Sequence, residues 1–308
     1  MNFSATYGAS GAISSNLNAT HSVAKGPGVD HDASLQSVAS LLQSAYDLAG
    51  ELRGLGPAVH KMAALQGASI RQRLDSIAGA VQALQADLAE ARGPLLARQL
   101  QNLGIDERSH DLQIHIGCGG HHLPGWINLD NYPAPLAVNL DWGIPLPDSS
   151  ARFVFLSHLL EHLFHPVQSH RLLDEIRRVL KPGGIVRIVV PDIEQCIAAY
   201  VHKDAAFFAA RRDHWTWLPE DMTRLESFLA YSGVGPTPEH LFEHHKFGYD
   251  FETLGRCLER VGFQAVRRCG FQASPHETLR VDHASSNASA QHGGGHYSLF
   301  VEAVRGAA

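Results

Sequence analysis

Residues 112–130, LQIHIGCGGHHLPGWINLD, constrain this chain most, because two short apolar runs enclose a glycine-rich turn. The first run, residues 112–116, alternates apolar side chains and predicts a strand. Glycine permits positive φ and a close approach of the backbone to a ligand, and the turn contains Gly117, Gly119 and Gly120. The second run ends at Asp130, where a carboxylate at the end of a strand can accept hydrogen bonds from a ribose. The stretch predicts a nucleotide-type cofactor site, although glycines also mark ordinary turns.

Strand and helix patterns alternate after this point. Apolar strand patterns span residues 112–116, 126–129, 137–140, 153–156 and 184–190. Residues 167–180 have helical apolar spacing, and the sequence KPGG at 181–184 ends that helix. Two more strands are predicted at 263–268 and 297–304, with a mobile polar loop at 282–296 between them. This alternation predicts an α/β fold, with a mostly parallel sheet and helices on both of its faces.

Six motifs follow one another in this region, namely GCG at 117–119, WINLD at 126–130, LPDS at 146–149, SHLLEH at 157–162, RVLKPGG at 178–184 and VVPD at 189–192. In this order they resemble the class I S-adenosylmethionine (SAM)-dependent methyltransferases, in particular the small type-11-like family. The resemblance covers residues 112–199 and continues more weakly through HKFGYD at 245–250, GF at 262–263 and SLFVEAVR at 298–305. It implies a Rossmann-like, seven-stranded, mostly parallel sheet with an antiparallel C-terminal hairpin.

The resemblance also implies which residues bind the cofactor, SAM. Gly117, Cys118 and Gly119 would lie against its methionine and ribose, and Ser157 would face its sulfonium. The other expected contacts are Asp130, Asp141 and Trp142. Asp130 would bind the ribose hydroxyls, and Asp141 with Trp142 would contact the adenine. Asp141 has an alternative role as a turn cap, and Trp142 has one as a core aromatic residue.

Two histidines are candidate catalytic residues. An oxygen acceptor loses a proton when it is methylated, and histidine, with an ordinary pKa of about 6.5, can take that proton near neutral pH. His158 is the first candidate because it follows the fourth strand, where the resemblance places the methyl group. His245 is the second. In the alternative interpretation, His158 only shapes the turn.

Two features depart from the family pattern. The position before the glycine loop, usually acidic or Asn, is His115, and His121 displaces the third glycine of the common loop. The connection over residues 120–125 is also short, because parallel neighbours usually need about a dozen residues or more between them. Either the first helix is vestigial or the predicted strand boundaries are wrong.

A competing motif overlaps the fourth predicted strand end. Residues 158–162, HLLEH, fit the inverted zinc-hydrolase pattern H-x-x-E-H, in which two histidines bind Zn²⁺ and the glutamate acts as a base. A match of this length arises easily in a chain with 20 histidines. Its position between a glycine loop and RVLKPGG favours the methyltransferase interpretation, so no metal is predicted.

The N-terminal third has a different organisation. Residues 1–33 are poor in large apolar groups and predict a disordered tail. Residues 34–105 predict a helical arm whose apolar seam contains Ile70, Leu74, Ile77, Val81, Leu84 and Leu88. Gly93 and Pro94 are expected to end its helix. The arm is either a hairpin folded on the catalytic domain or a coiled coil that forms a homo-oligomer.

The catalytic domain is predicted at residues 106–308, with a helical insertion at about 203–246. Inserted segments at the carboxyl ends of strands often form an acceptor pocket. Trp215 and Trp217 are the predicted pocket wall, while Phe207, Phe208 and Phe228 are predicted core residues.

Composition excludes several partners. A net charge of -6 argues against nucleic acid, because phosphate binding depends on clustered Lys and Arg. No apolar run approaches the roughly 18 residues of a membrane helix. The four cysteines lack CxxC spacing, which predicts reduced thiols and a cytoplasmic protein.

The sequence therefore predicts a SAM-dependent methyltransferase that acts on a small-molecule or glycan-type acceptor at oxygen. A catalytically inactive relative that uses the arm for assembly is the main alternative, and a zinc hydrolase is the other.

Overall fold

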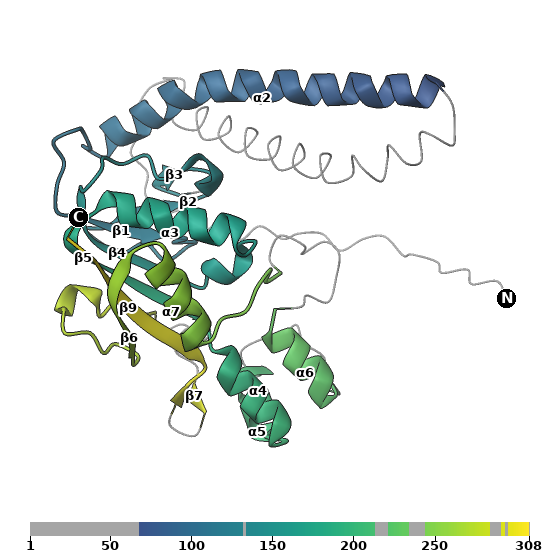
Figure 1. The fold of residues 1–308 in the computed structure, drawn as a ribbon, viewed down its shortest axis with the longest axis vertical. Helices are drawn as coiled ribbons and strands as arrows, with labels where there is room; N and C mark the ends of the chain where they lie inside the picture. Colours follow the sequence, from purple (N-terminus) through teal and green to yellow (C-terminus); the bar gives the residue numbers. More distant parts are fainter. Residues whose placement is uncertain are drawn as a thin grey trace, which may run out of the picture.

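A computed structural model describes residues 68–131, 134–212, 221–233, 244–283, 291–292 and 295–307. The predicted tail and the first half of the predicted arm, residues 1–67, lie outside this range. Within it, one large sheet carries helices, and a long helix crosses one side of it (Figure 1).

Seven strands form the sheet in the order β3-β2-β1-β4-β5-β9-β6. Their bounds are β1 Leu112–Ile116, β2 Ile127–Asp130, β3 Leu136–Ala137, β4 Ala151–Ser157, β5 Leu180–Pro191, β6 Phe263–Cys269 and β9 Ser298–Arg305. Strands β1 to β5 pair in parallel, whereas β9 pairs antiparallel with both β5 and β6. The predicted mostly parallel sheet with an antiparallel C-terminal pair is confirmed. A separate pair joins β7 Gln291–His292 and β8 Gly295–His296.

The described α-helices are α2 Ala68–Asn102, α3 Val167–Val179, α4 Ile193–Val201, α5 Ala205–Arg212, α6 Arg224–Tyr231 and α7 Phe251–Arg260. The described 3-10 turns are η1 Leu140–Trp142, η2 Leu160–His162 and η4 Glu277–Leu279. The strand predicted at residues 137–140 ends early, at Ala137. The Asn139 side chain accepts a hydrogen bond from the backbone N–H of Asp141, and this local bond favours the η1 turn over a continued strand.

The prediction of helices on both faces is wrong for the described residues. Helices α3 and α7 and the last turns of α2 all pack on one face, against a core that includes Ile114, Leu129 and Val154. On the opposite face, Phe155 and its neighbours are covered by loops and by η4, without any residue of a described α-helix. The short β1–β2 connection leaves no room for a helix there, so side chains such as Trp126 cover the sheet instead.

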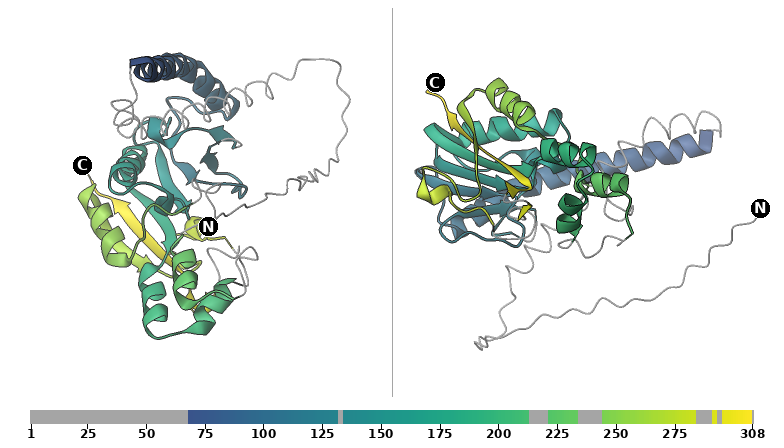
Figure 2. Two further views of the ribbon diagram at one scale, coloured as in Figure 1. Left: turned by 90° about the vertical axis from the view of Figure 1, so that its right-hand side faces the viewer. Right: turned by 90° about the horizontal axis from the view of Figure 1, so that it is seen from below.

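The helix predicted to end at Gly93 and Pro94 continues to Asn102. Proline removes one helical hydrogen bond and clashes with the preceding turn, and the preceding glycine reduces the crowding because it has no Cβ. Packing stabilises the turns beyond it, since Leu96 and Leu100 join the core and the Gln99 amide bonds both backbone groups of Ala137. The first part of α2 extends beyond the sheet (Figure 2).

Deleting residues 1–88 is expected to lower the oligomeric state without weakening cofactor binding, because it removes the apolar seam of the predicted coiled coil. The cut precedes Arg92, whose guanidinium donates to the Trp142 carbonyl oxygen at 2.7 Å and so belongs with the catalytic domain. Light scattering of full-length and truncated protein measures the change. An equal number of protomers per particle would rule out the coiled coil.

Helices α5 and α6 lie in the predicted insertion. Phe207, Phe208 and Tyr231 are buried there, and Phe228 packs against them. The predicted pocket wall, Trp215 and Trp217, lies outside the described residues. Among the described residues, no helix has both the length and the apolar character that a membrane span requires.

Candidate active site

The glycine loop lies between β1 and β2, and turns rather than a helix connect the two strands. The predicted strand boundaries are therefore nearly correct, and the first helix of the family pattern is missing. Gly117 has φ +71° and its backbone packs on Leu159, with which any Cβ would collide. Gly119 has φ +48° and open space where a side chain would stand, so a ligand can approach its backbone there.

Asn128 on β2 closes this short connection. Its amide oxygen accepts from the backbone N–H of Leu123 at 2.8 Å, and its amide nitrogen donates to the carbonyl oxygens of Leu123 and Trp126, both at 3.0 Å. Nδ1 of the buried His115 lies 3.3 Å from the same amide oxygen. Burial lowers the pKa of His115 to about 4, so its imidazole is neutral near pH 7. The sequence analysis did not identify Asn128, because its role depends on the fold of the loop.

The Asp130 carboxylate, at the end of β2, is held against the glycine loop. Its Oδ2 accepts from the Gly119 N–H at 2.7 Å, and its Oδ1 accepts from the Asn131 N–H at 2.6 Å. A carboxylate has about four lone-pair sites, so it retains capacity for a further donor. Cys118, in the same loop, is buried, which raises the pKa of its thiol to about 11. It is therefore not a nucleophile at neutral pH.

The predicted adenine contacts lie in η1. Asp141 accepts from Nε2 of Gln168 on α3 at 3.1 Å, and its backbone is capped by Asn139. The Trp142 side chain packs against the main core, and the Arg92 guanidinium lies 5.1 Å from its ring centroid. The indole thus joins the helical arm to the sheet, and the structural role that the sequence allowed for this residue is present.

Ser157 ends β4, and His158 follows it with φ +52°, a strained conformation for a residue other than glycine. Two partners orient its ring. Nδ1 lies 3.1 Å from Oε1 of Glu161, and Nε2 lies 3.0 Å from Oγ of Ser298 on β9. The arrangement resembles a base whose orientation is fixed by a buried acid.

Glu161 is the centre of this site, although its side chain is only 1% exposed. Burial alone would raise the pKa of its carboxyl. The neighbouring imidazoles, above all His158, have the larger opposite effect, so the pKa lies below its ordinary value. His162 and His245 also lie next to it, and their ring centroids are 4.8 Å apart. The Glu161 carbonyl oxygen also accepts from the Lys246 N–H at 2.7 Å, which docks the segment after the insertion here.

The structure therefore brings both predicted catalytic histidines to one carboxylate. The sequence did contain a signal for Glu161, the HLLEH motif, but it gave the glutamate a role only in the zinc alternative. No sequence signal pointed to Ser298, which lies 140 residues from His158.

The described geometry does not favour the zinc-hydrolase interpretation. That pattern needs both histidines of HLLEH on one helical face, whereas here η2 is a single 3-10 turn. The group that could hold a metal pairs Glu161 and His162 with His245 instead, and His158 is engaged by Ser298.

Three sets of candidate residues lie on neighbouring strands. Gly117 follows β1, Asp130 ends β2 and His158 follows β4, and the sheet order is β2-β1-β4. Because these strands are parallel, their carboxyl ends meet at one edge, which is where ligands bind in open α/β sheets.

Residues 133–188 match a family model described as a methyltransferase domain. Solved structures with similarity to the chain include a SAM-dependent methyltransferase from Archaeoglobus fulgidus, at 17% identity and TM-score 0.36, covering 69% of this chain and 94% of that one. Another is a SAM-dependent methyltransferase from Methanosarcina mazei, at 15% identity and TM-score 0.38, covering 68% and 98%. Both similarities are too low to assign a function. The family match covers β3, β4, α3 and most of β5, and this part of the chain is therefore similar to a methyltransferase domain.

Proposed function

We propose that SAM binds across the carboxyl ends of β2, β1 and β4. The proposed contacts are Gly117, Cys118 and Gly119 for the methionine and ribose, Asp130 for the ribose hydroxyls, Asp141 and Trp142 for the adenine, and Ser157 and His158 near the sulfonium. The observation that carries this proposal is the bond between the Gly119 N–H and Asp130, because it joins the two halves of a nucleotide site. The open space beside Gly119 also supports it.

Replacing Asp130 by alanine is expected to weaken SAM binding about tenfold to a hundredfold. A hydrogen bond to a charged group contributes roughly 1.5–3 kcal/mol, and every 1.4 kcal/mol changes an affinity about tenfold. Calorimetric titration with S-adenosylhomocysteine measures the effect. Asp111→Ala is the matched control, since that aspartate directly precedes β1 at the opposite end of the strand. Equal affinities for the two variants would show that Asp130 does not bind the ribose.

We infer that the reaction is an O-methylation in which His158 accepts the proton of the acceptor hydroxyl. Methyl transfer from a sulfonium is an in-line displacement that mainly requires the two reactants to be held close and aligned. Glu161 supports the role of His158, because a buried carboxylate fixes the imidazole and stabilises its protonated form. The Ser298 hydroxyl occupies Nε2, so an acceptor hydroxyl would take its place or pass its proton through it. His245, across Glu161, is the second candidate base.

We further propose that the acceptor is a small molecule or a glycan, bound between this edge and the insertion. The imidazole cluster suits an acceptor with a neutral hydroxyl better than one with a carboxylate. A hydroxyl has a proton for a histidine base to remove, whereas an ionised carboxylate has none. Transfer of labelled methyl groups from SAM to a panel of hydroxyl and amine compounds tests this. Alkali-stable label on hydroxyl compounds is expected, whereas label on amines alone would contradict O-methylation.

Two observations favour assembly without turnover as a second function. Arg92 of α2 covers Trp142, so the arm contacts the proposed adenine site, and the helix that usually follows the glycine loop is missing. SAM binding without transfer to any acceptor would support this alternative.

The cytoplasmic location stays a prediction from the four free cysteines.

A further inference from the structure

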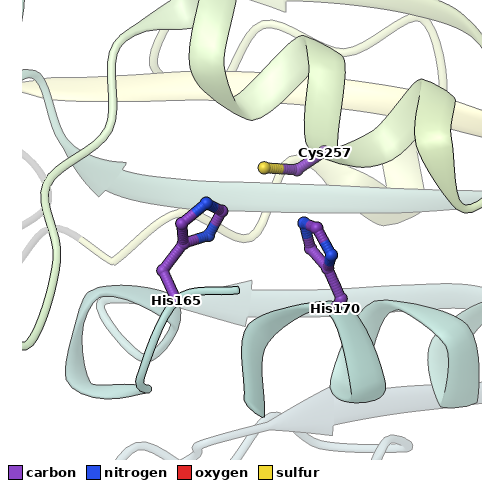
Figure 3. A group of neighbouring side chains, drawn as sticks. All are labelled: His165, His170 and Cys257. Atoms are coloured by element: carbon purple, nitrogen blue, oxygen red, sulfur yellow. The ribbon is translucent and has the colours of Figure 1, made fainter. Parts of the chain in front are cut away.

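A second group of potential metal ligands lies away from the proposed reaction. Nitrogen atoms of His165 and His170 and Sγ of Cys257 all lie within 4.8 Å of one another. His165 lies between η2 and α3, His170 is in the first turns of α3, and Cys257 is on α7. Figure 3 shows the two imidazoles on one side and the thiol facing them from the other. Three donors from separate elements thus converge on one point.

The surroundings of His165 fix its ring. Nδ1 lies 3.1 Å from Oγ of the buried Ser169, and Phe247 stacks on the ring with a centroid distance of 4.1 Å. The other ring nitrogen, Nε2, is thereby left for a different partner. A metal-binding histidine typically has this arrangement, in which a second partner holds the non-ligating nitrogen and sets the tautomer.

The donor set selects a class of metal. Two imidazoles and one thiolate suit Zn²⁺, which takes four ligands at about 2.0–2.1 Å for nitrogen and about 2.3 Å for sulfur. Burial raises the pKa of the Cys257 thiol, so it is protonated without metal, and binding releases that proton. His165 and His170 are only half-buried, which leaves solvent access for an ion and for a water ligand.

The other potential group, Glu161, His162 and His245, is less suitable. Glu161 is already paired with His158 at 3.1 Å. The pKa of His162 is lowered mainly by burial, and the positive charge of the nearby Lys246 ammonium also lowers it. A metal there would compete with the pair that orients the proposed base.

We propose that His165, His170 and Cys257 form a Zn²⁺ site with water as the fourth ligand. The ion joins the connection after η2 to α7, and Cys257 lies 87 residues after His170. A link that closes so long a loop restricts the unfolded chain more than one that closes a short loop. The ion stabilises the folded state by joining these two parts, and the site is separate from the proposed methyl transfer.

Titration of chelator-treated, full-length protein with Co²⁺ tests the site, because only a thiolate ligand gives a sulfur-to-cobalt charge-transfer band. We expect this band to saturate at one equivalent and to disappear when Zn²⁺ is added. A Glu–His–His site cannot produce it, so the band distinguishes the two groups. Binding of Co²⁺ without the band would overturn the proposal.

Variants locate the ligands. Cys257→Ser is expected to abolish the band, whereas Cys269→Ser, which removes the most accessible thiol, retains it. Ser169→Ala is expected to weaken metal binding about tenfold to a hundredfold through the orientation of His165. His170→Ala, at a half-buried position, repeats the test without disturbing the core, and thermal unfolding without metal confirms that it folds. A band that survives Cys257→Ser, or is lost in Glu161→Gln, would overturn the assignment.

Discussion

Replacing His158 by alanine is expected to reduce turnover by about a hundredfold to ten-thousandfold while the affinity for SAM stays unchanged. General-base catalysis contributes rate factors of this size. His158 has the required position, because it follows β4 at the proposed cofactor edge and its ring is held between Glu161 and Ser298. Single-turnover kinetics at saturating SAM, together with calorimetric titration, separates the two quantities.

Two companion variants sharpen this prediction. Glu161→Gln keeps the shape of the side chain but removes the charge that stabilises the imidazolium, so turnover should again decrease. His110→Ala, an exposed histidine that precedes β1, should leave turnover unchanged. Full turnover in His158→Ala, or loss of cofactor binding together with activity, would show that His158 is structural. The acceptor proton would then pass to His245, or the reaction would proceed without a protein base.

Replacing Asp282 by alanine is expected to reduce the free energy of unfolding by about 3–5 kcal/mol, because it removes one of the two carboxylates that compensate the buried charge of Arg187. Arg187, on β5, is completely buried. Its Nε and Nη2 donate to the two carboxylate oxygens of Asp282 at 2.7 and 2.6 Å, and its Nη1 donates to Glu302 at 2.8 Å. Urea denaturation measures the loss.

The exposed pair of Glu252 and Arg256 on α7 provides the control. Pairs of this kind contribute little because water and salt screen them, so Glu252→Ala should denature close to the original midpoint. Replacing Arg187 and its acidic partners together by apolar residues should recover part of the loss, since a well-packed apolar set can be as stable as a buried ion pair. If Asp282→Ala denatures like Glu252→Ala, Arg187 has another source of compensation.

Strand positions were predictable because apolar side chains that are buried on both faces of a parallel sheet leave a local signal. The sequence patterns at β1, β4 and β5 fall inside the observed strands. The antiparallel C-terminal pair was expected from the resemblance rather than from the pattern, since periodicity carries no information on which strands pair.

Errors arose where tertiary contacts override local preferences. The helix continues past Pro94 because Leu96 and Leu100 are buried beyond it. The predicted mobile loop at 282–296 begins with Asp282, which is 3% exposed because it binds an arginine 95 residues away. The rest of that loop is only partly described. No local pattern could have indicated a contact over this separation.

The candidate site was predictable only in part. The glycine loop and Asp130 follow from strand ends, and their hydrogen bond agrees with the predicted proximity. The pairing of His158 with Glu161 and Ser298 needed the fold, because it depends on a tight 3-10 turn and on a distant strand.

This chain is proposed to bind SAM at the edge where β2, β1 and β4 end. Thermal unfolding of demonstrably cofactor-free protein, with and without S-adenosylhomocysteine, tests it most directly. A ligand at about 100 times its dissociation constant stabilises the folded state by roughly 2.7 kcal/mol, so the unfolding temperature should rise with ligand concentration. The rise should be smaller in Asp130→Ala than in Asp111→Ala. No rise at millimolar ligand in the unmodified protein would contradict the account.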